Sequence, residues 1–355
     1  MNDIIIKDPV QKTRFEILYN ENKAYISSDL ELLIKNVILI FKRHNNNEEL
    51  IVLSLIYGLL YFSIIEINHK LITKNDLKNL KILKNSFNLE NSGEFKSLLN
   101  EIIAMDKDLF LLKTIIKYNI LSFEKKFINI VPNLNNYYKS IGYLIPYLTY
   151  IESPFLSFFQ DVYFKKIYPH KFEKTRKYYI EKISKVEFPG EHMFTIVNNV
   201  GDLMTESEVI GKTKVRRKTY FSIYNKLVRK KGVGVLDTIG IRLVFNNTED
   251  LYNFSNNFEN RYVYIDKKDY IKSPKENGYK SLHYKYISPY RDTQILVEIQ
   301  LRTLEMDKEI SDTNSISHFT YTVKQNKWHK IFKEIHAGYN YINKKLNETS
   351  ENKNK

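Results

Sequence analysis

The sequence of 355 residues contains no cysteine, which excludes disulfide bonds and thiolate metal sites and fits a reducing cytoplasm. Its N-terminus lacks the basic start, apolar run and small-residue cleavage site of a secretory signal, so we expect no leader. Long apolar runs are also missing. The most apolar window, residues 50–67, contains Glu66 and falls short of the ~20 apolar residues that a bilayer requires, so it predicts a buried helix. We therefore expect a cytoplasmic protein with no membrane partner.

Acidic residues are fewer than basic ones, 41 against 55, which gives a formal net charge of +14. Such a surface attracts polyanions, but charge alone does not choose among nucleotides, nucleic acid and an acidic membrane surface. Apolar residues make up 43% of the chain, enough for a sizeable core, and the length predicts two domains.

The first half of the sequence shows no strand-like alternation and few turn signals. Apolar residues recur at three and four spacing, which predicts helices over residues 30–41, 50–67, 101–120 and 139–159. We therefore predict an all-helical domain over residues 1–185.

The pattern changes after about residue 194. We predict a basic helix at 214–230, a strand at 235–245, a helix at 249–260, strands at 262–265, 280–288 and 294–303, and helices again over 304–345. This order predicts an α+β chain whose second domain, residues 186–345, is built on one sheet. The polar segment 346–355 predicts a disordered tail.

Four polar residues recur every four positions along the predicted basic helix and would line one face: Lys214, Lys218, Ser222 and Lys226. Such a row can bind a chain of phosphates, although a solvated lysine face has the same pattern. Arg216 and Arg217 favour the phosphate interpretation, because guanidinium groups pair with phosphate and stack on bases.

The predicted strand at 294–303 places Glu298, Gln300 and Arg302 on one face and four apolar side chains on the other. These three polar side chains have two interpretations. They form a cross-strand set of salt bridges, or they belong to a site in which Glu298 is a metal ligand or base, Gln300 orients a ligand by hydrogen bonding and Arg302 binds phosphate. Asp237 precedes another strand, where a carboxylate is usually a cap or turn residue; paired with Glu298 it would form a two-carboxylate Mg²⁺ site. Arg242 would join that site only if its strand bends, for which Gly240 is the candidate position.

The loop 268-KDYIKSPKENGYKSLH-283 combines cations, an aromatic ring and a glycine turn. Lys275 and Lys280 offer phosphate contacts, and Tyr279 is either a packed tyrosine or a flat surface for a base. His283 follows on the next strand. Together with the strands, this loop predicts a pocket for two anionic, base-bearing ligands and a divalent metal.

This loop, with 297-VEIQLRT-303 and 237-DTIGIRLV-244, resembles the synthetase domain of the RelA/SpoT alarmone enzymes over residues 205–324. That family transfers the β,γ-pyrophosphate of ATP to the 3′-hydroxyl of GDP or GTP, on a mixed sheet related to nucleotidyltransferases. The resemblance implies a Mg²⁺-dependent GTP diphosphokinase whose partners are ATP and GDP or GTP.

The family's roles can be carried over by position. The resemblance implies that the ATP phosphates bind to Arg216, Lys218, Ser222 and Lys226, and that Arg216 and Arg242 sandwich the adenine. Asp237 resembles the Mg²⁺ ligand, and Glu298 the second acidic residue, which binds metal and helps to activate the 3′-hydroxyl. The residues that match the acceptor side are Lys275, Asn277, Tyr279, His283, Gln300 and Arg302, with Tyr279 stacking on guanine.

The N-terminal half resembles the helical HD hydrolase domain of the long family members, and residues 146–183 resemble its connection to the synthetase. The best counterpart of the family's metal-binding His-Asp pair, within 59-LLYFSIIE-66, places Tyr61 and Phe62 there, and neither can ligate a metal as required. His44 and His69 lie beside no aspartate. We therefore expect a degenerate HD-like domain without hydrolase activity.

Some expectations stay open. Asp266 replaces the arginine or glutamate that the family usually carries before this loop, so the preference for GDP or GTP is not predicted. The sequence does not predict the oligomeric state either. The sequence ends soon after the synthetase region, so we expect no C-terminal regulatory domains. Two alternatives to the synthetase are a toxic relative that pyrophosphorylates the tRNA 3′ end, which the positive charge would suit, and a non-catalytic alarmone-binding sensor.

Overall fold

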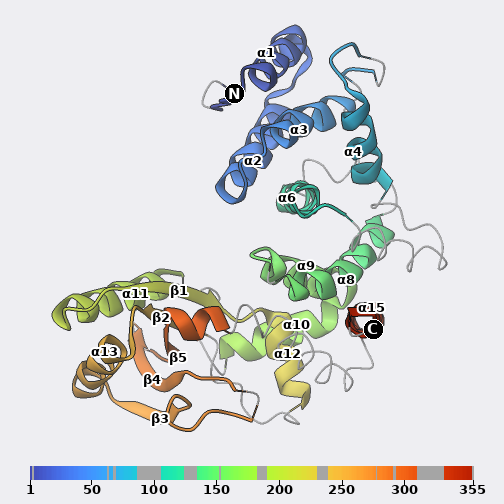
Figure 1. Cartoon of the computed structure of the whole chain (residues 1–355). Helices are drawn as coiled ribbons and strands as arrows, with labels where there is room; N and C mark the ends of the chain where they lie inside the picture. Colours follow the sequence, from blue (N-terminus) through green and yellow to red (C-terminus); the bar gives the residue numbers. More distant parts are fainter. Residues whose placement is uncertain are drawn as a thin grey trace. The chain divides into compact units, whose positions relative to one another are not determined.

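The structure is a computed structural model that describes residues 1, 4–61, 64–66, 69–85, 105–123, 134–151, 153–181, 190–229, 239–276, 278–290, 293–309 and 332–353. The chain divides into two compact units, Met1–Tyr147 and Leu148–Lys355 (Figure 1). The prediction of a helical part followed by a part built on a mixed sheet is confirmed for the described residues. None of their helices is long and apolar enough to cross a membrane.

Unit 1 is helical throughout its described part. In chain order its elements are α1 (Pro9–Asn22), the 3-10 helix η1 (Lys23–Tyr25), α2 (Ser28–His44), α3 (Glu48–Tyr61), α4 (Lys74–Asn85), α6 (Lys107–Ser122) and α8 (Leu134–Tyr150), whose last residues belong to unit 2. The side chains of Asp8, Ser27 and Asp106 accept hydrogen bonds from the first turns of α1, α2 and α6 and so fix where these helices begin. With Asp106 as its cap, α6 begins later than the predicted residue 101.

The apolar window predicted to be a buried helix forms α3, which packs against α1 and α2. Its side chains from Leu50 to Ile56 are buried without exception. The helix ends at Tyr61, and residues 64–65 form a bend, so it is shorter than the predicted 50–67.

The helix predicted over residues 139–159 is two helices. α8 ends at Tyr150, and α9 (Leu156–Ile167) begins after a turn. Pro154 accounts for the break, because it has no backbone N–H to donate and disfavours helical backbone at Ser153. The backbone of Ser153 instead donates to the carbonyl of Leu148 and accepts from the N–H of Leu156.

Unit 2 continues from α9 with α10 (Pro169–Tyr179), α11 (Gly190–Glu206), β1 (Gly211–Arg217), α12 (Tyr220–Arg229), β2 (Ile239–Phe245), α13 (Thr248–Arg261), β3 (Tyr264–Asp269), β4 (Leu282–Tyr290), β5 (Thr293–Thr303) and α15 (Lys333–Lys353). The sheet order is β1-β2-β5-β4-β3. β2 and β5 run parallel and the other neighbouring pairs run antiparallel, so the sheet is mixed.

The prediction of one basic helix over residues 214–230 is wrong. Residues 211–217 form the edge strand β1, which pairs with β2 along its whole length, and α12 begins only at Tyr220. Thr219 separates the two elements, because its hydroxyl accepts a hydrogen bond from the backbone N–H of Ser222 in the first turn of α12. The four-residue spacing suggested a helix, whereas pairing with the distant strand β2 determines the conformation.

Other boundaries differ less. β3 begins and ends later than the predicted strand at 262–265, and α13 matches its prediction within two residues. Residues 304–309 are helical as predicted, and residues 230–238 and 310–331 lie outside the described part. α15 runs to Lys353 and therefore covers most of the segment predicted to be a disordered tail.

One face of the sheet packs against α11 and α13 (Figure 1). The predicted alternation of β5 is confirmed: Ile295, Val297, Ile299 and Leu301 are fully buried in this core. α11 lies so close to β1 that a Cβ atom on Gly211 would meet the Cε atom of Met204 at 2.8 Å. Because this methyl group is the movable end of a side chain, the stricter limit on a larger residue is the backbone carbonyl oxygen of Val244, 3.0 Å from such a Cβ atom.

A second core lies among α9, α10 and α12 of unit 2. It is aromatic, with ring centroids 4.7–6.2 Å apart, and includes Phe164, Phe172, Tyr220, Phe221 and Phe332. α15 joins α8 through a hydrogen bond between the hydroxyls of Tyr339 and Thr149, and α9 through one that Tyr163 donates to Glu334. The compact unit that holds the sheet therefore begins before α9, earlier than the predicted domain boundary at residue 185.

Candidate functional site

The face of the sheet opposite α11 and α13 is polar. Strand pairing places Lys214 of β1, Arg242 of β2, Gln300 of β5 and His283 of β4 side by side in one row. Laterally paired residues point to the same face of a sheet, so these four side chains share it. Glu298 and Arg302 alternate with Gln300 along β5 and join them.

Glu298 belongs to a closed ring of polar contacts made by β4, β5 and the loop before β4. Gln300 donates from Nε2 to Glu298 Oε2 at 3.2 Å, and Arg302 donates from Nη2 to Gln300 Oε1 at 3.2 Å and to the Tyr279 hydroxyl at 2.7 Å. That hydroxyl shares a 2.8 Å hydrogen bond with His283 Nε2, and His283 Nδ1 lies 3.7 Å from Glu298 Oε1. The structure thus brings together five of the predicted site residues, which we call the polar ring.

The loop before β4 positions Tyr279. Gly278 has a φ of 76°, a left-handed conformation that favours glycine, and donates its N–H to the carbonyl of Lys275 at 2.8 Å. The ammonium of Lys275 lies 4.4 Å from the ring centroid of Tyr270 and 4.9 Å from that of Tyr279. Arg302 approaches the same Tyr279 ring at 5.1 Å, so the ring is an electron-rich platform flanked by two cations. Asn277 lies outside the described residues.

The residues predicted to bind ATP are divided among three elements and one connection between them. Arg242 lies on β2, Lys218 lies in the connection between β1 and α12, and Ser222 and Lys226 lie one turn apart on α12, where they share a face. Arg216 belongs to β1 opposite Gly240, and its side chain is outside the described part. β2 is regular through Gly240, so no bend of the kind proposed from the sequence occurs within Ile239–Phe245.

The sequence analysis missed Asp307, in the helical segment after β5. Its carboxylate accepts from Lys214 Nζ at 3.1 Å, Arg242 Nη1 at 3.2 Å and Arg302 Nη1 at 3.3 Å. Burial opposes ionisation of Asp307, but the hydrogen bond from Lys214 and the charges of the two arginines outweigh it and lower its pKa below the ordinary value. Sequence spacing could not reveal this residue, because its partners come together only through the strand order.

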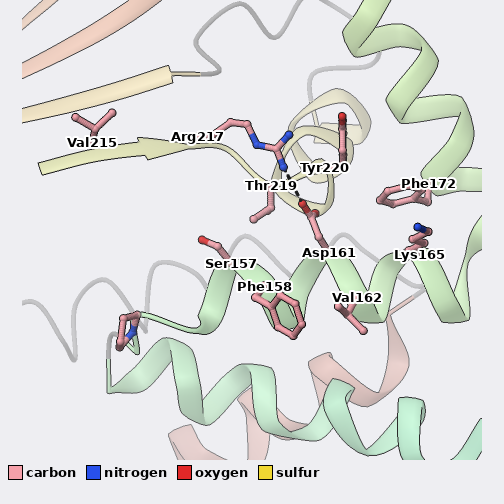
Figure 2. A pocket seen from close by; sticks show the side chains of 11 residues that line it. Ser157, Phe158, Asp161, Val162, Lys165, Phe172, Val215, Arg217, Thr219 and Tyr220 are labelled. Atoms are coloured by element: carbon pink, nitrogen blue, oxygen red, sulfur yellow. Dashed lines mark hydrogen bonds and ion pairs between the residues drawn. The ribbon is translucent and has the colours of Figure 1, made fainter. Parts of the chain in front are cut away.

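Two hollows flank β1. A small one of about 160 Å³ opens on the polar face and is lined by Lys214, Val215, Gly240, Ile241, Arg242 and Gln300. A larger one of about 560 Å³ lies between α9, α10 and the start of α12. Figure 2 shows Arg217 of β1 reaching Asp161 of α9 across this larger pocket, with Nη2 and Oδ2 3.3 Å apart. Asp161 also accepts from the backbone N–H of Phe221, and its burial raises its pKa to about 6.

The described residues contain one of the two carboxylates predicted to bind Mg²⁺. Glu298 is half-buried on the polar face, and its oxygens suit Mg²⁺, which commonly uses one or two carboxylates together with substrate phosphates. Asp237, the second predicted ligand, lies outside the described part. Within that part no three histidine or acidic side chains gather closely enough to hold a metal without a substrate.

Residues 215–326, which include the polar ring and Asp307, match the family model described as a region found in RelA / SpoT proteins. This part of the chain belongs to the RelA/SpoT family. The resemblance stated from the sequence motifs is therefore confirmed for the RelA/SpoT region.

Curated relatives of the RelA/SpoT region carry the names of two opposite activities. The guanosine-3′,5′-bis(diphosphate) 3′-pyrophosphohydrolase of Borreliella burgdorferi is 30% identical over 169 residues, 46% of this chain and 24% of that protein. The protein of the same name from Aquifex aeolicus is 31% identical over 173 residues, 47% and 24% of the two chains. A GTP pyrophosphokinase of Brucella melitensis is 28% identical over 166 residues, which are 45% of this chain and 21% of that protein. The match spans about a quarter of the length of the first two relatives.

Solved structures similar to this chain include two small alarmone synthetases of Bacillus subtilis. Small alarmone synthetase 2 is 27% identical and matches 45% of this chain and 93% of its own, with a TM-score of 0.34. Small alarmone synthetase 1, bound to its product pppGpp, is 22% identical. The match covers 46% of this chain and 91% of that chain, with a TM-score of 0.33.

Proposed function

We propose that this chain is a Mg²⁺-dependent pyrophosphokinase that transfers the β,γ-pyrophosphate of ATP to the 3′-hydroxyl of GDP or GTP. The observation that carries the proposal is the polar ring, which joins the only predicted catalytic residue in the described part, Glu298, to four predicted acceptor-binding residues. The membership of residues 215–326 in the RelA/SpoT family supports it.

The acceptor nucleotide binds at the Tyr279 end of the polar ring. Guanine stacks on the Tyr279 ring, whose hydroxyl is anchored by Arg302 and His283. Lys275 is held beside the same ring and contacts the acceptor's phosphates with its ammonium. In this arrangement the sugar of the acceptor lies towards Glu298, and Asn277 completes the acceptor side.

ATP binds at the β1–β2 side of the polar face. Lys218, just before α12, and Ser222, in its first turn, contact its phosphates where the positive end of the helix dipole adds to the attraction. Lys226 reaches them from the last turn of the same helix. Arg216 and Arg242 hold the adenine. Glu298 and Asp237 would hold a Mg²⁺ ion, which would supply positive charge that stabilises the transferred pyrophosphate.

Glu298 then accepts the proton of the acceptor's 3′-hydroxyl. The hydroxyl oxygen forms a bond to the β-phosphorus of ATP, and the bond from that phosphorus to the oxygen it shares with the α-phosphate breaks, so AMP leaves. Gln300 orients the Glu298 carboxylate by donating to one of its oxygens, and His283 Nδ1 lies 3.7 Å from the other. Such a reaction depends on alignment and charge stabilisation more than on covalent participation by the protein.

We propose that the helical half does not hydrolyse alarmones. Tyr61 and Phe62, which stand where an active hydrolase has its His-Asp pair, cannot bind Mn²⁺ as that pair does. In the described part, Nε2 of His69 lies 3.6 Å from a carboxylate oxygen of Glu21 of α1.

The test is transfer of label. The purified chain is incubated with Mg²⁺ and ATP labelled in its β-phosphate, with GDP, GTP or tRNA offered separately. We expect label on a guanine nucleotide, and at least a 100-fold loss of kcat in Glu298→Gln, which keeps the shape and removes the base. Glu206→Gln, a surface carboxylate of α11 bonded to Arg261, serves as the control and should keep full activity.

Other outcomes would contradict the proposal. Label on tRNA alone would favour the tRNA-modifying alternative, which the net charge of +14 suits. Tight nucleotide binding with no transfer to any acceptor would favour the sensor. Full activity of Glu298→Gln would contradict the assignment of the base.

A further inference from the structure

Three cations from three different strands meet at one carboxylate on the polar face. Lys214 comes from β1, Arg242 from β2 and Arg302 from β5, and all three lie 3.1–3.3 Å from an oxygen of Asp307. One carboxylate charge does not balance three cations at this spacing, so the cluster retains a net attraction for anions. Three converging donors fit a phosphate group better, because it carries more charge and more acceptor oxygens than a carboxylate.

The cluster is open to ligands on one side. Lys214 is 61% exposed, whereas Asp307 is 14% and Arg302 3% exposed. The hollow of about 160 Å³ lined by Lys214, Arg242 and Gln300 lies beside the cluster. A phosphate group can therefore reach the cations from this hollow without displacing core residues.

Asp307 is attached to a short backbone element. Residues 304–309 form a helical segment directly after β5, and the hydroxyl of Thr303 accepts from the N–H of Met306 at 3.2 Å. A change of rotamer at Asp307 alone would release the carboxylate from the cations, because an aspartate side chain has only two rotatable bonds.

We infer that Asp307 is an internal counter-anion, which holds Lys214, Arg242 and Arg302 together as an anion-binding subsite and gives way to a phosphate group when one binds. The subsite takes a phosphate group of ATP: Arg242 can donate to it through the edge of its guanidinium while the face of that group stacks on the adenine, and Arg302 reaches it from the acceptor half of the site. This assignment rests on the proposed function, but the exchange of one anion for another does not require turnover.

The experiment measures binding of inorganic pyrophosphate by calorimetry to the full chain and to Asp307→Asn, which keeps the shape and removes the charge. We expect roughly tenfold tighter binding by the variant, with a steeper decrease as salt is added, because the cations are no longer neutralised. Glu305→Gln is the matched control: it changes the charge equally on the same segment, but its exposed side chain lies two residues away, and its binding should equal that of the wild type. Equal or weaker binding by Asp307→Asn would overturn the inference, since a carboxylate that only preorganises the cations weakens binding when removed.

A second variant keeps the test decisive if Asp307→Asn does not fold. Lys214→Gln removes the most exposed cation of the cluster and should weaken pyrophosphate binding several-fold, whereas unchanged binding would mean that pyrophosphate does not reach the subsite.

The proposed function and the counter-anion role of Asp307 would be contradicted by different results. A chain that binds pyrophosphate as expected but transfers no label contradicts the proposed function alone, and a chain that transfers label while Asp307→Asn binds no more tightly contradicts the counter-anion alone.

Discussion

Tyr279 combines two contacts that a substitution can separate. Its ring is approached by Lys275 and Arg302, and its hydroxyl bonds to Arg302 and His283. If guanine stacks on the ring, the ring matters more to acceptor binding than the hydroxyl does.

We therefore expect Tyr279→Phe to raise the KM for the acceptor less than tenfold and Tyr279→Ala to raise it by roughly tenfold to 100-fold, as loss of about 1–3 kcal/mol of stacking implies. Steady-state kinetics with GDP and GTP measure both, and the KM for ATP is the internal control, since ATP binds elsewhere. Equal effects of the two variants would mean that the hydroxyl, and not stacking, holds the acceptor.

Residues of the candidate site differ in how well the sequence predicted them. Glu298, Gln300 and Arg302 were placed on one face because alternation along a strand is a local property, which β5 retains. Asp307 has its partners on three strands, so no local pattern reveals it. Lys214 was assigned to the wrong element for the same reason, because its conformation depends on pairing with β2.

At the scale of elements, Asp161 connects α9 with the turn between β1 and α12. Its carboxylate binds Arg217 and the N–H of Phe221, and burial raises its pKa to about 6 from an ordinary value of 3.8. Between these two pH values the folded chain binds the proton and the unfolded chain does not. This group's contribution to the free energy of unfolding therefore increases as pH falls through about 6, and is complete below about pH 3.8.

From pH 7 to pH 5 the gain amounts to about 1 kcal/mol, equivalent to a rise in Tm of roughly 2–4 °C for a unit of this size. We expect Asp161→Asn to lose this part of the pH dependence. Thermal unfolding of both proteins at the two pH values measures the difference, with Asp202→Asn on the exposed side of α11 as the control. An unchanged pH dependence in Asp161→Asn would mean that the carboxylate titrates in the ordinary range of an aspartate.

The elements themselves were predicted unequally. α2 and β5 carry strong apolar periodicity, α13 is a polar helix, and each was predicted close to its observed bounds. The division of residues 139–159 into α8 and α9 depends on Pro154, a single residue in a continuous apolar pattern. The strand β1 has a basic sequence with little apolar signal, and it exists because β2 offers it a partner.

At the scale of the whole chain, the two compact units allow a direct test of where the sheet domain begins. The aromatic core of α9, α10 and α12 belongs to the unit that starts at Leu148. A cut at the predicted boundary, residue 185, removes Phe164 and Phe172 and exposes the partners they bury.

We expect a fragment of residues 148–355 to unfold cooperatively and a fragment of residues 186–355 to be less stable by several kcal/mol, because removing buried phenylalanines costs about 3–5 kcal/mol each. Thermal unfolding followed by near-ultraviolet circular dichroism compares the two. The same Tm for both fragments would contradict the assignment of α9 and α10 to the sheet unit.

The sheet order also determines which parts of the site can form first. The polar ring lies within Tyr279–Arg302, mostly on the antiparallel hairpin β4–β5, whose strands are neighbours in the sequence. The Asp307 cluster needs in addition the parallel pair β2–β5, whose strands are far apart in the sequence and close a long loop. Loop closure of this kind is slow in folding, so a partly folded chain can contain the acceptor side without the subsite that bridges it to ATP.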